Sequence, residues 1–256
     1  MGKPRWEYIY GINPAFEVIR GGRRKVHEAF LSESSRNNPR LKKLEGLLAS
    51  RQIPTHWVEK GRVLDLSESK DNQGVVLRTE PYPYVASSTL FDRPRLLLLD
   101  NVEDPHNTGA ILRCADVFGY DAVLLPEKGV PEIYPSVVKV SAGATEHLDI
   151  ARDHNAVKHM IEARKAGYTV VALDAKGKTS LPDAARLCTG KFLLVIGGEN
   201  RAVSQYILNE ADIIIGIHQY GKINSLNASV AAGIAMHALR GEDPSGPCAT
   251  IKDAEN

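Results

Sequence analysis

From residue 95 onward, short apolar runs alternate with segments of helical period, and this alternation constrains the fold more than any other feature. We expect strands over 95–99, 122–125, 169–173, 191–196 and 213–217. We expect helices over 107–118, 136–144, 155–166, 181–187, 203–210 and 225–240. Short, nearly continuous apolar runs are typical of parallel strands that helices cover on both faces. The pattern therefore predicts an α/β fold with a parallel sheet between two layers of helices.

The last apolar stretch, residues 213–240, is the most unusual part of the chain. A strand leads through a polar loop into a helix that Ser225 is expected to cap, just as Asn107 is expected to cap an earlier helix. Small residues fill most of this helix around a stripe with a spacing of four residues. The stripe consists of Leu226, Val230, Ile234 and Ala238. Because small side chains let other backbones approach closely, we expect the helix to pack on several sides, in an ordinary core or beside a ligand site.

Residues 1–78 form a separate, smaller unit in which helices and strands also alternate. We expect strands over 26–31, 53–58 and 74–77, helices over 15–20 and 36–50, and a short turn or helix over 63–66. Asn13 is expected to cap the first helix, with Pro14 at its first position. The stretch 79–94 contains three prolines and no period, which is typical of a linker. It is followed by a second domain over 95–241 and a tail over 242–256 that is expected to be disordered.

The charge of the chain is unevenly distributed. The first 90 residues contain 15 Lys and Arg against 10 Asp and Glu, whereas the remainder contains 17 against 21. A basic front part indicates a surface that meets a polyanion, although a solvated lysine-rich surface would give the same count. The candidates for phosphate contacts are Arg20, Arg23, Arg24, Lys25, Arg40, Lys42 and Lys43. Tyr8, Tyr10 and Trp57 are candidates for stacking on bases or for packing in the core.

Several classes of protein are disfavoured by what the sequence lacks. It has no apolar run of about 18 residues and no apolar signal core, so we expect no membrane partner. Its three cysteines are scattered and odd in number, which argues against a disulfide framework and against a zinc site. We therefore expect no metal and a cytoplasmic location, or an organelle matrix if a transit peptide was removed.

Three polar stretches, 101–113, 197–200 and 218–227, follow expected strands. Because the carboxyl ends of parallel strands meet at one edge of a sheet, these stretches predict one composite ligand site. The sequence contains neither a GxGxxG fingerprint nor a GxxxxGK[ST] loop, which disfavours a nucleotide-dependent oxidoreductase. Gly197-Gly198 alone would fit an ordinary tight turn equally well.

The same stretches resemble a known family. DPHNTGAILRCADVFG, LLVIGGENRAVS and IGIHQYGKINSLNASVAAGIAMHAL are similar, in order and spacing, to the three motifs of the SpoU or TrmH branch of the SPOUT RNA methyltransferases. This resemblance covers residues 96–239. The segments YGINPAFEVIRGG and NQGVVL resemble the L30e-like substrate-binding domain of the rRNA guanosine 2′-O-methyltransferases. Asn72 stands where that family usually has histidine.

The resemblance implies a fold, a cofactor and a set of site residues. The fold would be an α/β domain with a deep C-terminal trefoil knot, preceded by the L30e-like domain and assembled as a homodimer with the site near the interface. S-adenosylmethionine would bind in the knot, held by backbone groups of Gly197, Ile217 and Leu226. Catalysis would fall on Asn107, Arg113, Glu199, Ser225 and Asn227. Because arginine stays protonated, Arg113 acts either as an unusual base or by gripping phosphate and the developing alkoxide.

The expected function is S-adenosylmethionine-dependent methylation of a ribose 2′-hydroxyl in RNA. The N-terminal unit favours large-subunit rRNA, and within it a guanosine, because simpler tRNA enzymes of this branch often lack such a unit. Two alternatives stay open at this point. One is a tRNA 2′-O-methyltransferase, and the other is a non-catalytic RNA-binding or ribosome-assembly factor on the same fold.

Overall fold

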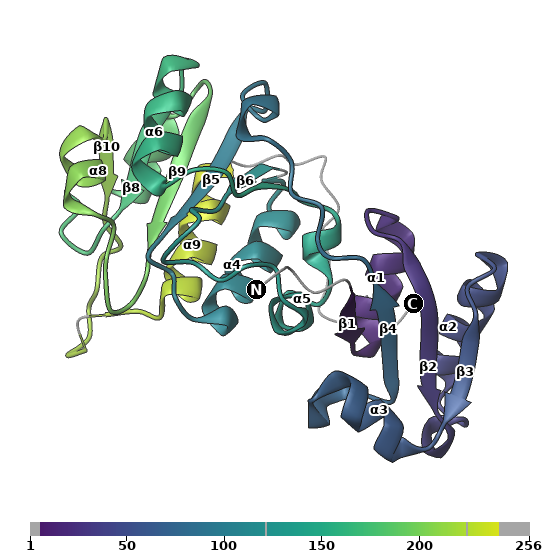
Figure 1. Ribbon diagram of the computed structural model, residues 1–256. Coiled ribbons are helices and arrows are strands. Elements are labelled where there is room, and N and C mark those ends of the chain that lie inside the picture. Colours follow the sequence, from purple (N-terminus) through teal and green to yellow (C-terminus); the bar gives the residue numbers. More distant parts are fainter. Residues whose placement is uncertain (1–5, 121, 224, 241–256) are drawn as a thin grey trace.

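The structure, a computed structural model, describes residues 6–120, 122–223 and 225–240. Its strands form one sheet of four strands and one of six, which lie at opposite ends of the molecule (Figure 1). The expected disordered tail lies outside the described residues. Within the described residues, no helix is long and apolar enough to cross a membrane.

The N-terminal sheet is mixed. Its strands are β1 (Glu7–Tyr10), β2 (Val26–Ser32), β3 (Thr55–Val58) and β4 (Val75–Thr79). Their order is β1-β4-β2-β3, with β4 antiparallel to both of its neighbours and β3 parallel to β2. The accompanying helices are α1 (Ile12–Gly21), α2 (Pro39–Ser50) and α3 (Lys60–Ser67). This part is therefore the small α/β unit that the alternating pattern predicts.

The C-terminal sheet is entirely parallel. Its strands are β5 (Arg95–Asp100), β6 (Ala122–Leu124), β7 (Asp149–Ala151), β8 (Thr169–Leu173), β9 (Phe192–Gly197) and β10 (Ile213–Ile215). Their order is β10-β8-β9-β5-β6-β7, so the prediction of a parallel sheet is confirmed. β7 was not predicted, because Asp149-Ile150-Ala151 contains one large apolar residue and therefore forms no apolar run.

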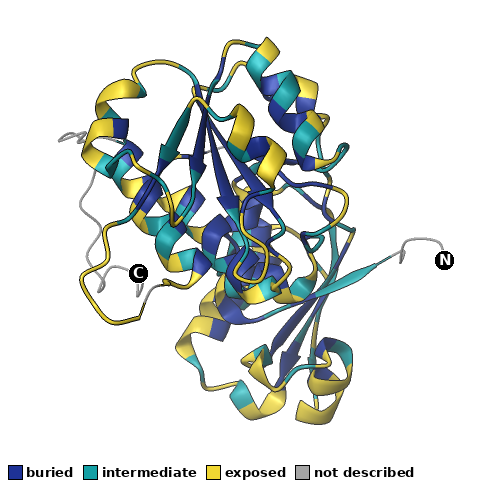
Figure 2. Cartoon of the chain, turned by 90° about the vertical axis from the view of Figure 1, so that its left-hand side faces the viewer, coloured by how far each residue is buried: buried dark blue, intermediate teal, exposed yellow. Residues whose placement is uncertain are grey.

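Helices cover both faces of the parallel sheet. They are α4 (Pro105–Val117), α5 (Pro135–Val140), α6 (Ala156–Lys165), α7 (Leu181–Leu187), α8 (Gln205–Glu210) and α9 (Ala228–Arg240). Alternate residues of β5 face opposite sides: Leu97 belongs to the apolar cluster that includes residues of α4, α5, α7 and α9, and Leu98 belongs to the cluster that includes residues of α6 and α8. The strands are accordingly the most deeply buried part of the domain (Figure 2).

Two expected helix caps in the C-terminal domain are wrong. Asp104, not Asn107, caps α4, and its side chain accepts a hydrogen bond from the His106 amide at 3.0 Å. Asp104 is followed by Pro105, and this cap-proline pair is a stronger start signal than the asparagine three residues after the cap. In α9 the side chain of Asn227, not Ser225, accepts the Ser229 amide at 2.9 Å. Asn107, near the start of α4, and Asn227, at the start of α9, both lie at the carboxyl edge of the sheet.

The first helices of the N-terminal domain also begin at other positions than expected. Gly11, with φ of 99°, precedes α1, so Asn13 lies within the helix and does not cap it. Asn38 caps α2 by accepting the Arg40 amide, with Pro39 at the first position, so the helix starts three residues later than expected.

The segment expected as a linker is fixed to the C-terminal sheet. The Tyr82 hydroxyl donates to the Leu148 carbonyl at 2.6 Å and to the Thr145 carbonyl at 3.1 Å, and Val85 forms a bridge to Ala151. The apolar core of the N-terminal domain is continuous with the core beneath α4, α5 and α9. The two domains are therefore packed against each other along this segment.

Two of the arginines that we expected to contact RNA hold this domain interface instead. The Arg24 side chain is completely buried and pairs with Glu146 at 2.9 Å and with Glu7 at 2.7 Å. Arg23 pairs with Asp149 at 2.8 Å. The prediction that Arg23 and Arg24 contact phosphates is therefore wrong, because their charges are already neutralised between the domains.

Candidate functional site

Three loops meet at the carboxyl ends of β5, β9 and β10 with backbone packed against backbone. A Cβ atom on Gly198 would lie 2.0 Å from the Asn101 carbonyl oxygen, and one on Gly197 would lie 2.3 Å from the Val203 nitrogen. Gly177 and Gly216 approach each other equally closely in the neighbouring loops. Gly197-Gly198 is therefore more than an ordinary turn, because any side chain at either position would force the loops apart.

A pocket lies against these loops. It contains all three residues that were expected to bind the cofactor, together with Glu199 and Ser225. Its apolar walls come from residues such as Ile196, Val203, Ala228 and Ala231. Apolar walls beside exposed backbone groups suit a flat heteroaromatic ring such as adenine, and the Glu199 carboxylate suits a nearby positive charge. The residues of this pocket therefore fit S-adenosylmethionine.

Beside the pocket, three side chains from three separate segments, the first turn of α4, the loop after β9 and the start of α9, are joined by hydrogen bonds. The Asn227 amide nitrogen donates to Asn107 Oδ1 at 2.9 Å and also to Glu199 Oε1. Glu199 Oε1 additionally accepts the Ala228 amide at 3.4 Å. Because Asn227 Oδ1 caps α9, this one side chain links the start of α9 to α4 and to the loop after β9.

Arg113 lies apart from the other expected site residues. It is exposed on α4, six residues beyond Asn107, and therefore points to a different side of the helix. It lines a separate cleft in which none of the other expected site residues takes part. No hydrogen bond or ion pair joins its side chain to another residue in the described part of the chain. A single chain thus does not bring Arg113 together with the pocket.

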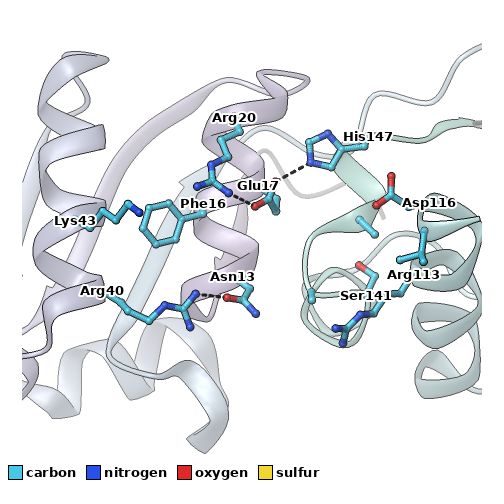
Figure 3. Close-up of a pocket in the computed structure, with 13 residues that line it drawn as sticks. Asn13, Phe16, Glu17, Arg20, Arg40, Lys43, Arg113, Asp116, Ser141 and His147 are labelled. Carbon is cyan, nitrogen blue, oxygen red and sulfur yellow. Dashed lines mark hydrogen bonds and ion pairs between the residues drawn. The ribbon is translucent and has the colours of Figure 1, made fainter. Parts of the chain in front are cut away.

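The cleft that contains Arg113 lies between the two domains (Figure 3). Its volume is about 360 Å³. Sequence reasoning missed several of its residues, namely Phe16, Glu17, Asp116, Ser141 and His147. These residues lie in helices or short turns that are far apart in the chain, and no spacing in the sequence indicates that they meet. Burial raises the pKa of Asp116, and a lesser effect of His147 opposes this rise.

The described ranges, 6–120, 122–223 and 225–240, contain no group of three or more His, Cys, Asp or Glu side chains that could hold a metal ion.

Comparison with known proteins identifies the family. Residues 94–237 match the SpoU rRNA Methylase family, and residues 8–85 match the RNA 2′-O ribose methyltransferase substrate-binding family. A putative TrmH family tRNA/rRNA methyltransferase, YacO, from Bacillus subtilis is 31% identical, covering 91% of this chain and 94% of the relative. The 23S rRNA (guanosine-2′-O-)-methyltransferase RlmB of Pseudomonas putida is 29% identical, covering 90% and 94%.

Solved structures share the fold. A crystal structure of an RNA 2′-O ribose methyltransferase superimposes with a TM-score of 0.76 at 20% identity, covering 92% of this chain and 88% of the other. The AdoMet-bound rRNA methyltransferase from Sinorhizobium meliloti gives 0.73 at 23% identity, covering 92% and 87%.

The two family matches, together with the fold, define an RNA 2′-O ribose methyltransferase of the α/β class. The chain belongs to the SpoU rRNA methylase family and carries that family's substrate-binding domain at its N-terminus. S-adenosylmethionine is accordingly its methyl donor.

Proposed function

We propose that this protein methylates the ribose 2′-hydroxyl of a guanosine in large-subunit rRNA. The observation that carries the proposal is the hydrogen-bonded group of Asn107, Asn227 and Glu199 beside the glycine-walled pocket, joined in one chain to an RNA-binding domain. The choice of rRNA is supported by the N-terminal domain and by the similarity to the guanosine enzyme of Pseudomonas putida.

In this proposal the pocket residues hold the methyl donor. Backbone groups of Gly197, Ile217 and Leu226 bind it, and the apolar walls enclose its adenine. When bound, S-adenosylmethionine would supply the methyl group that passes from its sulfur to the ribose 2′-oxygen, which would leave S-adenosylhomocysteine, and the hydroxyl proton would pass to solvent water. Asn107, Asn227 and Glu199 hold α4, the start of α9 and the loop after β9 together, so that the reacting atoms can be held in line. Ser225 lines the same pocket, and its hydroxyl is a candidate to orient the ribose.

The role that suits Arg113 is electrostatic. Its guanidinium stays protonated, so it is a poor proton acceptor. It can instead grip a phosphate next to the target and stabilise negative charge on the 2′-oxygen.

We propose that the active unit is a homodimer. Leu226, Val230 and Ile234, the stripe that we expected to be packed, are 42%, 51% and 41% exposed in the single chain. Contiguous apolar side chains of this kind favour a covering partner. A second copy on this face would supply the missing packing, and it would bring Arg113 of one copy near the pocket of the other, because α4 and α9 lie side by side (Figure 1). We also propose that α9 is drawn through a loop as a trefoil knot, which accounts for its many small residues.

The test is methyl transfer from radiolabelled S-adenosylmethionine to unmodified large-subunit rRNA and, separately, to unmodified tRNA, followed by mapping of 2′-O-methylated nucleotides. We expect one methylated guanosine in rRNA and none with Arg113→Ala. Methylation of tRNA alone would overturn the choice of substrate. RNA binding without methylation, in a protein that binds the donor, would favour a non-catalytic assembly factor.

A further inference from the structure

The cleft between the domains has two chemically different ends. One wall is formed by α1 and α2 of the N-terminal domain, and the other by α4 and the turn after α5 (Figure 3). The cleft is lined by Asn13, Phe16, Glu17, Arg20, Arg40, Lys43, Arg113, Asp116, Val117, Ser141, Ala142, Ala144 and His147. Some of its charged side chains are paired with one another, whereas others have no carboxylate partner.

At one end the polar groups are engaged with one another. Glu17 accepts a hydrogen bond from Arg20 at 2.7 Å and contacts the His147 ring across the domain boundary at 2.8 Å. Asp116 lies in the same part of the cleft and interacts electrostatically with His147. The single cation of this end, Arg20, is therefore already paired with a carboxylate.

At the other end the charges are all positive. Arg40 donates to the neutral Asn13 side chain, and Lys43 and Arg113 make no hydrogen bond or ion pair with any described residue. Arg40 and Lys43 come from the N-terminal domain, whereas Arg113 comes from the opposite wall (Figure 3). Three cations that line one cleft without a carboxylate partner form a site for an anion.

We propose that this cationic end, formed by Arg40, Lys43 and Arg113, binds the RNA backbone next to the target nucleotide. This rests on the proposed function, and it assigns the phosphate-binding residues that place the substrate. The three cations come from a substrate-binding domain and a methyltransferase domain. The anions that suit such a site are the phosphates of the RNA. The cleft has a volume of about 360 Å³, comparable to that of a small-molecule pocket, which suits one RNA strand better than a duplex. We therefore expect the target nucleotide to lie in an unpaired segment.

The width of the cleft is fixed by the domain interface. A Cβ atom on Gly143, whose φ is 93°, would lie 2.6 Å from Cβ of Glu17. The buried pair of Arg24 and Glu146 lies in the same interface. The RNA strand would thus meet two walls that are already in position, because the interface fixes the placement of α1 relative to the turn after α5.

The experiment compares Arg40→Ala, Lys43→Ala and the double variant with Arg62→Ala in the full-length protein. Arg62 is an equally exposed cation on α3 of the same domain, but it does not line the cleft. The probe is a fluorescent single-stranded RNA oligonucleotide of mixed sequence, titrated at several salt concentrations, with the same sequence as a duplex for comparison. Calorimetric titration with S-adenosylmethionine and circular dichroism verify that each variant is folded and binds the donor.

We expect the slope of log affinity against log salt to fall by about 0.7 for each phosphate contact removed, and hence by about twice that in the double variant. Arg62→Ala should keep the slope of the unaltered protein, and the single strand should bind more tightly than the duplex. If the double variant loses no more than Arg62→Ala while the unaltered protein binds and methylates RNA, the cleft assignment is overturned and the proposed function stands. If the unaltered protein binds no RNA, both are overturned.

Discussion

The Asn227 side-chain amide donates a hydrogen bond to Asn107 at 2.9 Å, across 120 residues of sequence. The same amide group donates to Glu199, and its oxygen caps α9. One side chain thus performs two separable tasks, one by its nitrogen and one by its oxygen.

Asn227→Asp separates these two tasks. The carboxylate keeps the oxygen that caps α9, but it cannot donate to Asn107 and it repels Glu199. We expect the helix content to be retained. The affinity for S-adenosylmethionine and the rate of methyl transfer should both be strongly reduced. Asn227→Ala should in addition lose about 1 kcal/mol of folding stability with the cap. Calorimetry, methyl-transfer assays and thermal melts measure these effects. Equal methyl transfer by Asn227→Asp and the unaltered protein would contradict a role for the amide nitrogen.

The parallel sheet could be predicted because its strands are buried on both faces and therefore read as apolar runs in the sequence. The composite site could be predicted in part, since Gly197, Glu199, Ser225 and Leu226 follow strands whose carboxyl ends meet.

The position of Arg113 could not be predicted from the residues alone, because six helical residues carry it away from Asn107 to a cleft formed with the other domain. The pairing of Arg24 with Glu146 could not be predicted either, because a buried ion pair between distant segments produces no periodic pattern in the sequence. A basic cluster next to a Gly-Gly turn gives the same sequence pattern whether its side chains bind RNA or pair with a carboxylate of the other domain.

Gly198→Ala tests the close packing of the loops. Because the new methyl group would lie 2.0 Å from the Asn101 carbonyl oxygen, the loop after β9 must move away from β5. We expect a stability loss of about 1–3 kcal/mol and a loss of S-adenosylmethionine binding. Gly190→Ala is the matched control, since a Cβ atom there meets nothing within 4 Å. Urea denaturation and calorimetry distinguish the two. If Gly198→Ala binds the donor normally, the pocket does not depend on these loops.

Val230→Glu tests the homodimer. The side chain is 51% exposed in the single chain, so a charge there is tolerated in a monomer but is unfavourable in an apolar interface. We expect sedimentation to show a shift from dimer to monomer, and we expect methyl transfer to fall with it. Tyr206→Glu, at an equally exposed apolar position on α8, should leave the assembly unchanged. A dimer that persists in Val230→Glu would place the interface elsewhere.

Arg24→Met tests the domain interface. The substitution removes the positive charge between two partly or fully buried carboxylates, those of Glu7 and Glu146, and leaves them without their partner. Breaking a buried ion pair in this way costs about 3–5 kcal/mol, so we expect a clear drop in the urea midpoint. Arg20→Met, which removes an exposed pair with Glu17, should change stability by less than about 1 kcal/mol. An equal effect of the two substitutions would mean that the interface does not depend on the buried pair.

His159 makes the stability of the protein depend on pH in a definite direction. Its side chain is fully buried on α6, and burial lowers its pKa from the ordinary value of 6.5, against the opposing effect of the Asp153 carboxylate. Between the lowered and the ordinary pKa the unfolded chain binds more protons than the folded chain, so the free energy of unfolding must decrease as pH falls below about 6.5. In His159→Leu this contribution is absent, and the free energy of unfolding should vary less between pH 7 and pH 5, whatever its absolute value. Urea titrations across this range measure the slope. The exposed His106 provides the control His106→Gln, which should keep the steeper dependence, and an unchanged slope in His159→Leu would show that other groups govern the acid sensitivity.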